Sequence, residues 1–145
     1  MTDQKQDTID RLLEAPCWVI DFLPRRVPPH SEGQFFAVEK YFSSAPRLEA
    51  FRLKLADVLL KLSCYFDFEV IPGGEEAFRN PPPDTLAGWI ANPRRTLLIL
   101  LNSAQSLITL YPGDLCAAVH QPTGELLALL RPLAAANGLF VWRAE

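Results

Sequence analysis

Apolar residues recur at steps of three and four positions between residues 46 and 63, and this spacing predicts a long amphipathic helix. Its apolar stripe consists of Leu48, Phe51, Leu55, Val58, Leu59 and Leu62. Pro46 suits the first turn of this helix, where the missing N–H of a proline is not needed. We therefore expect this helix to pack against the main hydrophobic core.

A second amphipathic helix is predicted from residue 31 to about residue 42. Ser31 followed three residues later by Gln34 is a capping-box pattern, in which the two side chains satisfy backbone N–H groups at the start of a helix. Phe35, Val38 and Phe42 then fall on one face, so we expect this helix to dock its phenylalanines on the core. Further helices are predicted for residues 7–14, 84–91 and 122–137, and Gly138 provides the left-handed residue that commonly ends a helix.

Alternation with a period of two predicts strands at residues 17–23 and 65–71. Short apolar segments at 96–101, 106–111 and 115–120 are separated by turn signals, Asn102-Ser103 and Tyr111-Pro112-Gly113-Asp114, the second of which suits a type II turn. These segments predict an antiparallel meander, although a helix at 115–120 is an alternative. Residues 139–142 predict a closing strand.

Helices interleaved with antiparallel strands are typical of the α+β class. We predict a single, mainly antiparallel sheet with helices packed on one or both faces. A chain of 145 residues is the usual length of one domain, so residues 1–145 are expected to form a single globular unit.

The net charge of −3 and the pI near 5.4 argue against nucleic-acid binding, which requires a basic face. The N-terminal segment lacks the pattern of a secretory signal, and the longest aliphatic run, residues 97–101, is too short to cross a membrane. Cys17, Cys64 and Cys116 are an odd number of cysteines at wide spacings, which favours free thiols. We therefore expect a cytoplasmic protein.

The C-terminal half of the chain is nearly free of charge, because only five of the last fifty residues are charged. The predicted helix around residues 125–136 is apolar almost all round, with five leucines and four alanines. Such a surface is either the centre of the core or a subunit interface. This pattern favours a homodimer that associates through the apolar C-terminal half.

Residues 16–42 hold the strongest candidates for chemistry. Asp21 lies in an apolar strand, where loss of solvent would raise its pKa toward a range useful for acid or base catalysis. His30 follows in a proline-rich loop and could approach it, while Arg25 and Arg26 could hold an anionic ligand. The alternative for Asp21 is a structural carboxylate that accepts hydrogen bonds from the loop, and no nucleophile completes a catalytic site.

Two further patterns are weaker. Cys116 and His120 would share a face of a strand, but four residues of strand span about 13 Å, too far for both to bind one zinc ion. Gly73-Gly74 follows a strand but lacks the spacing of a phosphate loop and precedes two glutamates. We therefore expect no metal and no cofactor.

The segments PCWVIDFLP and GQFFAVEKYF, with the ending NGLFVW, resemble a family of short uncharacterised proteins from clostridial gut bacteria. The resemblance covers most of the chain and is weakest at residues 72–95. It implies a stand-alone bacterial protein and transfers no activity or catalytic residue.

Together these patterns favour a non-enzymatic protein-interaction module, cytosolic and homodimeric, with an unknown protein partner and no affinity for nucleic acid or membranes. The competing hypothesis is a small enzyme or anionic-ligand-binding protein that uses Asp21 and His30. Convergence of Asp21, His30 and an arginine in one pocket would favour the second hypothesis.

Overall fold

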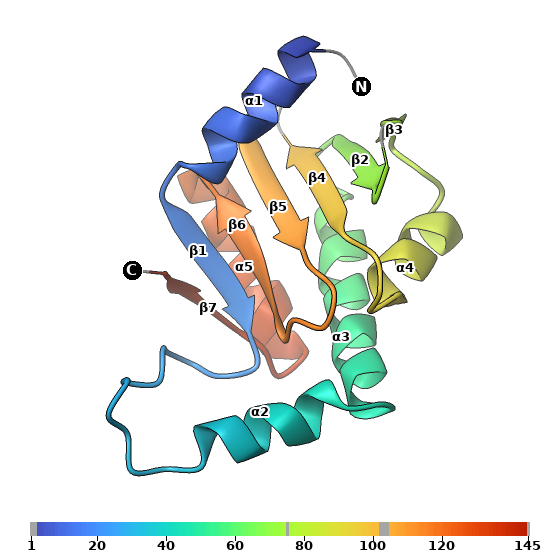
Figure 1. The fold of residues 1–145 in the computed structure, drawn as a ribbon. Coiled ribbons are helices and arrows are strands. Elements are labelled where there is room, and N and C mark those ends of the chain that lie inside the picture. The colour runs from blue at the N-terminus through green and yellow to red at the C-terminus, as the bar shows by residue number, and fades with distance from the viewer. Residues whose placement is uncertain (1–2, 75, 102–104, 145) are drawn as a thin grey trace.

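The computed structural model describes residues 3–74, 76–101 and 105–144 (Figure 1). The helices in these residues are α1 (Asp3–Leu13), α2 (Phe35–Ser43), α3 (Arg47–Leu62), α4 (Pro83–Ala91) and α5 (Gly124–Ala136). The strands are β1 (Cys17–Asp21), β2 (Phe68–Pro72), β3 (Phe78–Arg79), β4 (Leu97–Leu101), β5 (Ser106–Leu110), β6 (Cys116–His120) and β7 (Phe140–Arg143).

The strands form one antiparallel sheet in the order β3-β2-β4-β5-β6-β1-β7. β4, β5 and β6 make the meander that the short apolar segments predict. β1, from the start of the chain, is inserted between β6 and β7, and its last residue, Asp21, pairs with Cys116 on one side and Phe140 on the other. The predicted α+β class with a single antiparallel sheet is confirmed.

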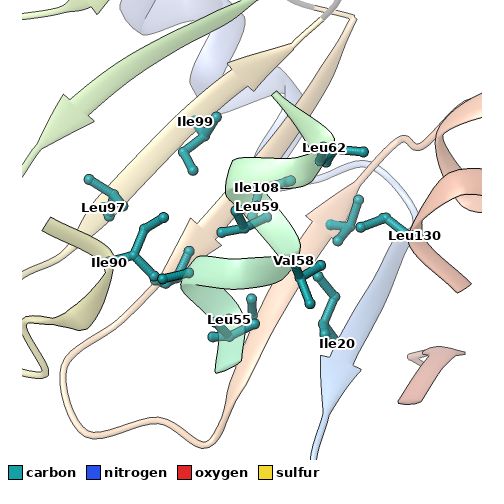
Figure 2. Close-up of a cluster of buried hydrophobic side chains, with 14 of the residues drawn as sticks. Ile20, Leu55, Val58, Leu59, Leu62, Ile90, Leu97, Ile99, Ile108 and Leu130 are labelled. Atoms are coloured by element: carbon teal, nitrogen blue, oxygen red, sulfur yellow. The ribbon is translucent and has the colours of Figure 1, made fainter. Parts of the chain in front are cut away.

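The main core lies between one face of the sheet and helices α3, α4 and α5. Figure 2 shows Leu55, Leu59 and Leu62 of α3 in one cluster with Ile99 and Ile108 of the sheet. All five side chains are completely excluded from solvent. The three- and four-residue spacing of α3 therefore has the role expected from the sequence.

Helix α1 covers part of the opposite face of the sheet (Figure 1). Ile9 and Leu12 pack there on Ile71, Leu100 and Leu107 in a second, smaller core. Helices thus pack on both faces of the sheet. None of the helices among the described residues is long and apolar enough to cross a membrane.

Two predicted helix starts are wrong. α1 begins at Asp3, before the predicted start at residue 7. The capping box at Ser31 does not form, because α2 begins only at Phe35 and its cap position makes no side-chain hydrogen bond. The Ser31 hydroxyl instead accepts a hydrogen bond from the Gly33 N–H at 3.2 Å, so it stabilises a turn in the loop.

The prediction that α2 docks its phenylalanines in the core is also wrong. No side chain of this nine-residue helix is buried. Val38 and Phe42 face the rest of the molecule but remain 39% and 40% exposed. The helix packs mainly against α3, below one end of the sheet (Figure 1), where the core has already been closed by other residues.

The turn before β6 follows the predicted type II pattern. Gly113 has φ of +78°, and the Asp114 N–H donates to the Tyr111 carbonyl at 3.3 Å. The segment that follows is strand β6, so the helical alternative is wrong. Gly138, with φ of +72°, follows α5 as predicted. The predicted Asn102-Ser103 turn lies outside the described residues.

Four of the five leucines of α5 pack within one chain, and the fifth, Leu127, is half-buried. Leu126 and Leu130 are buried, and Leu129 and Leu133 pack against the main core. Its exposed positions are the three alanines at 128, 135 and 136 together with Gly124, Glu125, Arg131 and Pro132. An apolar stripe on α5 therefore gives no reason of its own for a second subunit, and self-association through the C-terminal half stays a prediction.

Candidate functional site

Asp21 lies where the sheet, the proline-rich loop and α2 meet. Its carboxylate accepts a hydrogen bond from the Phe22 N–H at 2.8 Å. The indole N–H of Trp142, on the neighbouring strand β7, donates to the carbonyl of Leu23 at 2.9 Å. The Asp21 carboxylate, at the end of β1, therefore lies at the edge of the core, and the Trp142 ring of β7 lies beside it.

Burial is the main cause that raises the pKa of Asp21 from 3.8 to about 6. Hydrogen bonds from the backbone of Phe22 and Leu23 and from the Trp142 side chain oppose this shift, while the negative charge of Glu39 adds to it. The pKa of Asp21 is therefore raised, as the strand pattern predicts. Asp21 also accepts hydrogen bonds from the loop, as expected if it is a structural carboxylate.

A cleft of about 360 Å³ separates the proline-rich loop from Trp142. Asp21, Arg25 and Arg26 all line it, together with aromatic and proline side chains of the loop and of α2. The loop can form this wall because Pro24, Pro28 and Pro29 stiffen it and leave few backbone donors to satisfy. Asp21 and the two candidate arginines are thus brought together.

His30 is not part of this arrangement. It lies in the same loop, but it is exposed and is not among the residues that line the clefts around Asp21. The hypothesis of a His30–Asp21 acid/base pair therefore lacks the convergence that it requires. Its neighbours Pro29 and Ser31 line the cleft, so the loop passes the site without turning its histidine inward.

An adjoining cleft of about 330 Å³ lies on the other side of Asp21. Glu39 of α2 and Asp114 of the β5–β6 turn line it, and so does Cys116. Burial, followed by the charges of Asp114, Asp21, Cys17 and Glu39, raises the pKa of the Cys116 thiol to about 12. This thiol stays protonated and is a poor nucleophile.

Neither cleft has the geometry of a metal centre. Among the described residues, no group of three or more His, Cys, Asp or Glu side chains is placed to hold a metal ion. Cys116 and His120 share a face of β6 as predicted, opposite Asp21 and Cys17 of β1 respectively. Burial lowers the pKa of His120, and a hydrogen bond with the Ala15 backbone opposes this shift, so His120 contacts the connection between α1 and β1.

No family model, no curated protein and no solved structure matches this chain. The resemblance to the clostridial family stays a prediction. The use of the clefts is therefore argued from their geometry and chemistry.

A third hollow, which we call the α2 groove, runs between α2, α3 and the segment before β7. It encloses about 380 Å³, and its walls are mostly apolar; they consist of Phe22, Leu23, Val38, Phe42, Ala50, Phe51, Leu115, Gly138 and Leu139. Arg47 and Lys54 are the two charged residues that line it. The Arg47 guanidinium also stacks over the Tyr41 ring, 3.7 Å from its centroid.

The groove explains why α2 leaves apolar side chains in water. Its stripe is directed at the molecule, and the Phe42 ring contacts Phe22 with centroids 5.6 Å apart. On the far side of the helix, Phe36 is 82% exposed. α2 has apolar residues on both sides and no buried side chain. It therefore exposes apolar surface that no other part of the same chain covers.

The residues that the sequence did not indicate as site residues are Trp142, Glu39 and Asp114. The sequence alone favours a core position for Trp142 in a short apolar strand. Its place beside Asp21 depends on the pairing of β1 with β7. The alternation of β7 does carry one signal, because it puts Phe140 and Trp142 on one face. Only the register with β1 shows that this face includes Asp21.

Proposed function

We propose that this protein is a non-enzymatic interaction module that holds a segment of a partner protein in the α2 groove. The observation that supports this proposal best is the open apolar stripe of α2, which faces the molecule but stays 39–40% exposed at Val38 and Phe42. An apolar side chain that entered the groove would bury both residues and pack against Phe51 and Leu139, which are already buried. The volume lies at the lower end of the roughly 300–1,000 Å³ found for ligand sites.

The charges around the groove indicate the chemistry of the partner segment. Arg47 and Lys54 line it, and no carboxylate is among its lining residues. A segment with apolar anchors flanked by aspartate or glutamate therefore fits the groove better than a basic one. Such recognition uses apolar side chains for affinity and charge for specificity.

The protein is proposed to act in the cytoplasm, where thiols remain reduced. Cys17, Cys64 and Cys116 are all free, and Cys64 is exposed. An exposed free thiol is more usual in a reducing compartment than in a secreted protein. The resemblance to clostridial proteins supports a bacterial cytoplasm.

Photo-crosslinking in the native cell tests the groove directly. A benzophenone amino acid that replaces Phe42 should give a discrete protein adduct, because it reaches into the groove. The same amino acid at Tyr65, an aromatic residue that is also exposed but lies outside the groove, should give none. The adducts are compared by mass spectrometry.

A charge reversal on α3 supplies the matched control. Lys54→Glu should reduce the Phe42 adduct at least several-fold, whereas Lys61→Glu makes the same change on the same helix outside the groove and should leave it intact. Equal adducts from both probe positions, equal effects of the two lysine variants, or a lipid as the crosslinked species would each contradict the proposal.

A second candidate function is the binding of a small anionic ligand beside Trp142. The specific observation is that Arg25, Arg26 and Asp21 line one cleft with this tryptophan. Arginine binds carboxylates and phosphates through paired hydrogen bonds, and the aromatic wall favours a ring on the ligand. The ionised Asp21 would repel such a ligand, so its protonation should favour binding.

Benzoate is a suitable probe because it stays ionised across the relevant pH range. We expect it to shift the NMR signal of the Trp142 indole N–H and to bind several-fold more tightly at pH 5 than at pH 8, on either side of the Asp21 pKa of about 6. Arg25→Ala should abolish the shift, and Arg94→Ala, an exposed arginine outside the cleft, should not. Binding that ignores both pH and Arg25 would exclude this candidate.

A further inference from the structure

Strand β7 leaves one row of backbone groups without a partner strand. It is the edge of the sheet beside β1, and no strand of the described residues lies beyond it (Figure 1). The Ala144 N–H donates to the Cys17 carbonyl at 3.0 Å. Because hydrogen-bonding residues alternate along an antiparallel strand, Phe140, Trp142 and Ala144 face β1. The N–H and C=O groups of Val141 and Arg143 therefore point outward.

The other edge of the sheet is protected against pairing. β3 has only two residues, one of which is Arg79, and prolines follow at residues 81–83. Short strands, charge and proline are the usual means by which proteins prevent an edge from recruiting another strand. β7 has twice the length and no proline, and its Phe140 side chain is 41% exposed. The two edges are thus not equivalent.

We propose that a second copy of this chain adds its own β7 antiparallel to this edge, about a two-fold axis that passes beside Trp142. In this register Val141 lies opposite Arg143 of the second copy, and the reverse pair follows by symmetry. Both pairs are of the hydrogen-bonded type. The four outward-facing N–H groups and the four outward-facing C=O groups of the two β7 strands therefore all find partners. A two-fold axis beside Val141 would instead pair Arg143 with Leu139, whose N–H already donates to Ala134.

The same register fits the side chains. The two Trp142 residues face each other as a non-hydrogen-bonded pair, on the sheet face that carries Asp21. The indole N–H of Trp142 donates to Leu23, beyond the end of β1, so the ring is held back from the edge. Each Val141 side chain, half-buried against the main core, lies opposite the stem of Arg143. The two Arg143 residues are diagonal neighbours on this face, about 7–8 Å apart, so their long side chains must diverge toward solvent.

This arrangement is separate from the α2 groove and does not depend on it. It places self-association in the C-terminal half of the chain, through the backbone of β7 and without the leucines of α5. The seven-stranded sheet becomes continuous across the axis, and the clefts beside Trp142 in the two copies come to lie near each other.

Sedimentation velocity over a range of concentrations tests the proposal. The chain should sediment as a dimer with twice the mass of 16.3 kDa. Arg143→Pro removes one outward N–H per copy without touching the bonds to β1, and it should weaken the dimer at least tenfold. Arg143→Thr removes the same side chain, keeps the N–H and should leave the dimer intact.

Hydrogen exchange adds a residue-level measurement. In the wild type, the amides of Val141 and Arg143 should become protected as the protein concentration rises. A strict monomer at high concentration, a dimer that Arg143→Pro and Arg143→Thr affect equally, or a dimer that Phe42→Asp abolishes would overturn the proposal. Thermal unfolding of the two Arg143 variants at low concentration establishes that both fold.

Discussion

Replacing Arg52 with alanine should lower the free energy of unfolding by about 3–5 kcal/mol, a large part of the roughly 5–15 kcal/mol that stabilises a domain. Arg52 is only 1% exposed, although it lies within the main core helix α3. Its guanidinium donates to the Tyr111 carbonyl at 2.8 Å and more weakly to the Ile90 carbonyl at 3.5 Å. Alanine would remove these donors, leaving the Tyr111 carbonyl only its longer hydrogen bond from the Asp114 N–H at 3.3 Å, and would open a cavity.

Arg52→Met separates the two causes of this loss. Methionine keeps most of the buried volume and removes the buried charge, so it should cost less than half as much as alanine. Urea denaturation at pH 7 with intrinsic fluorescence measures both variants. A loss below about 1 kcal/mol for alanine would show that the carbonyl contacts are not important. Equal losses for both variants would assign the whole loss to the carbonyl contacts and none of it to the cavity.

Arg52 also supports one wall of the candidate site. Tyr111 opens the turn that carries Asp114, and Asp114 lines the cleft beside Asp21. Burial lowers the pKa of Arg52, and the charge of Asp114 opposes that shift. The buried guanidinium thus joins α3 to the end of α4 and to one wall of the cleft.

Replacing Asp21 with asparagine should stabilise the protein by about 2 kcal/mol above pH 7 and have almost no effect near pH 3.5. Because the pKa of Asp21 is raised from 3.8 to about 6 in the folded state, the folded protein holds this proton more tightly than the unfolded chain does. The associated stability is complete below pH 3.8 and is lost as the pH rises through 6. Asparagine cannot ionise, so it avoids the loss.

Thermal unfolding of the two proteins from pH 3.5 to pH 8 measures the difference. Asp57→Asn, at an exposed position on α3, is the control and should leave the pH dependence unchanged. A destabilised Asp21→Asn variant at pH 8 would mean that its hydrogen bonds outweigh its burial. A stabilised variant would support a functional reason for keeping a carboxylate at this position.

The hydrophobic pattern predicts most elements of this fold because each depends on local spacing. The stripe of α3, the meander of β4 to β6 and the glycines at 113 and 138 require no knowledge of distant residues. The stripe even contains a signal for Arg52, which lies four residues after Leu48 and three before Leu55. A charged residue at such a position either interrupts the apolar stripe with an exposed side chain or is buried and hydrogen-bonded. Only the carbonyl partners seen in the structure distinguish these two alternatives.

The errors occur where local signals compete with packing. Ser31 and Gln34 satisfy a capping pattern, but the Ser31 hydroxyl accepts from Gly33 in the loop instead. The phenylalanines of α2 have the spacing of a core-facing helix, yet the core is complete without them. A periodic stripe indicates which side chains would be buried together, and it does not indicate whether a surface is available to bury them.

The sequence by itself determined the α+β class, the approximate elements and the unusual position of Asp21, because alternation and helical spacing are properties of neighbouring residues. Tertiary structure alone decided that Arg25 and Trp142 join Asp21 while His30 does not, that α2 stands beside an open groove, and that β7 is an unprotected edge. These features depend on strand order and register, which bring residues more than a hundred positions apart into contact. No local pattern encodes a pairing of that length, because its free energy comes from the whole sheet.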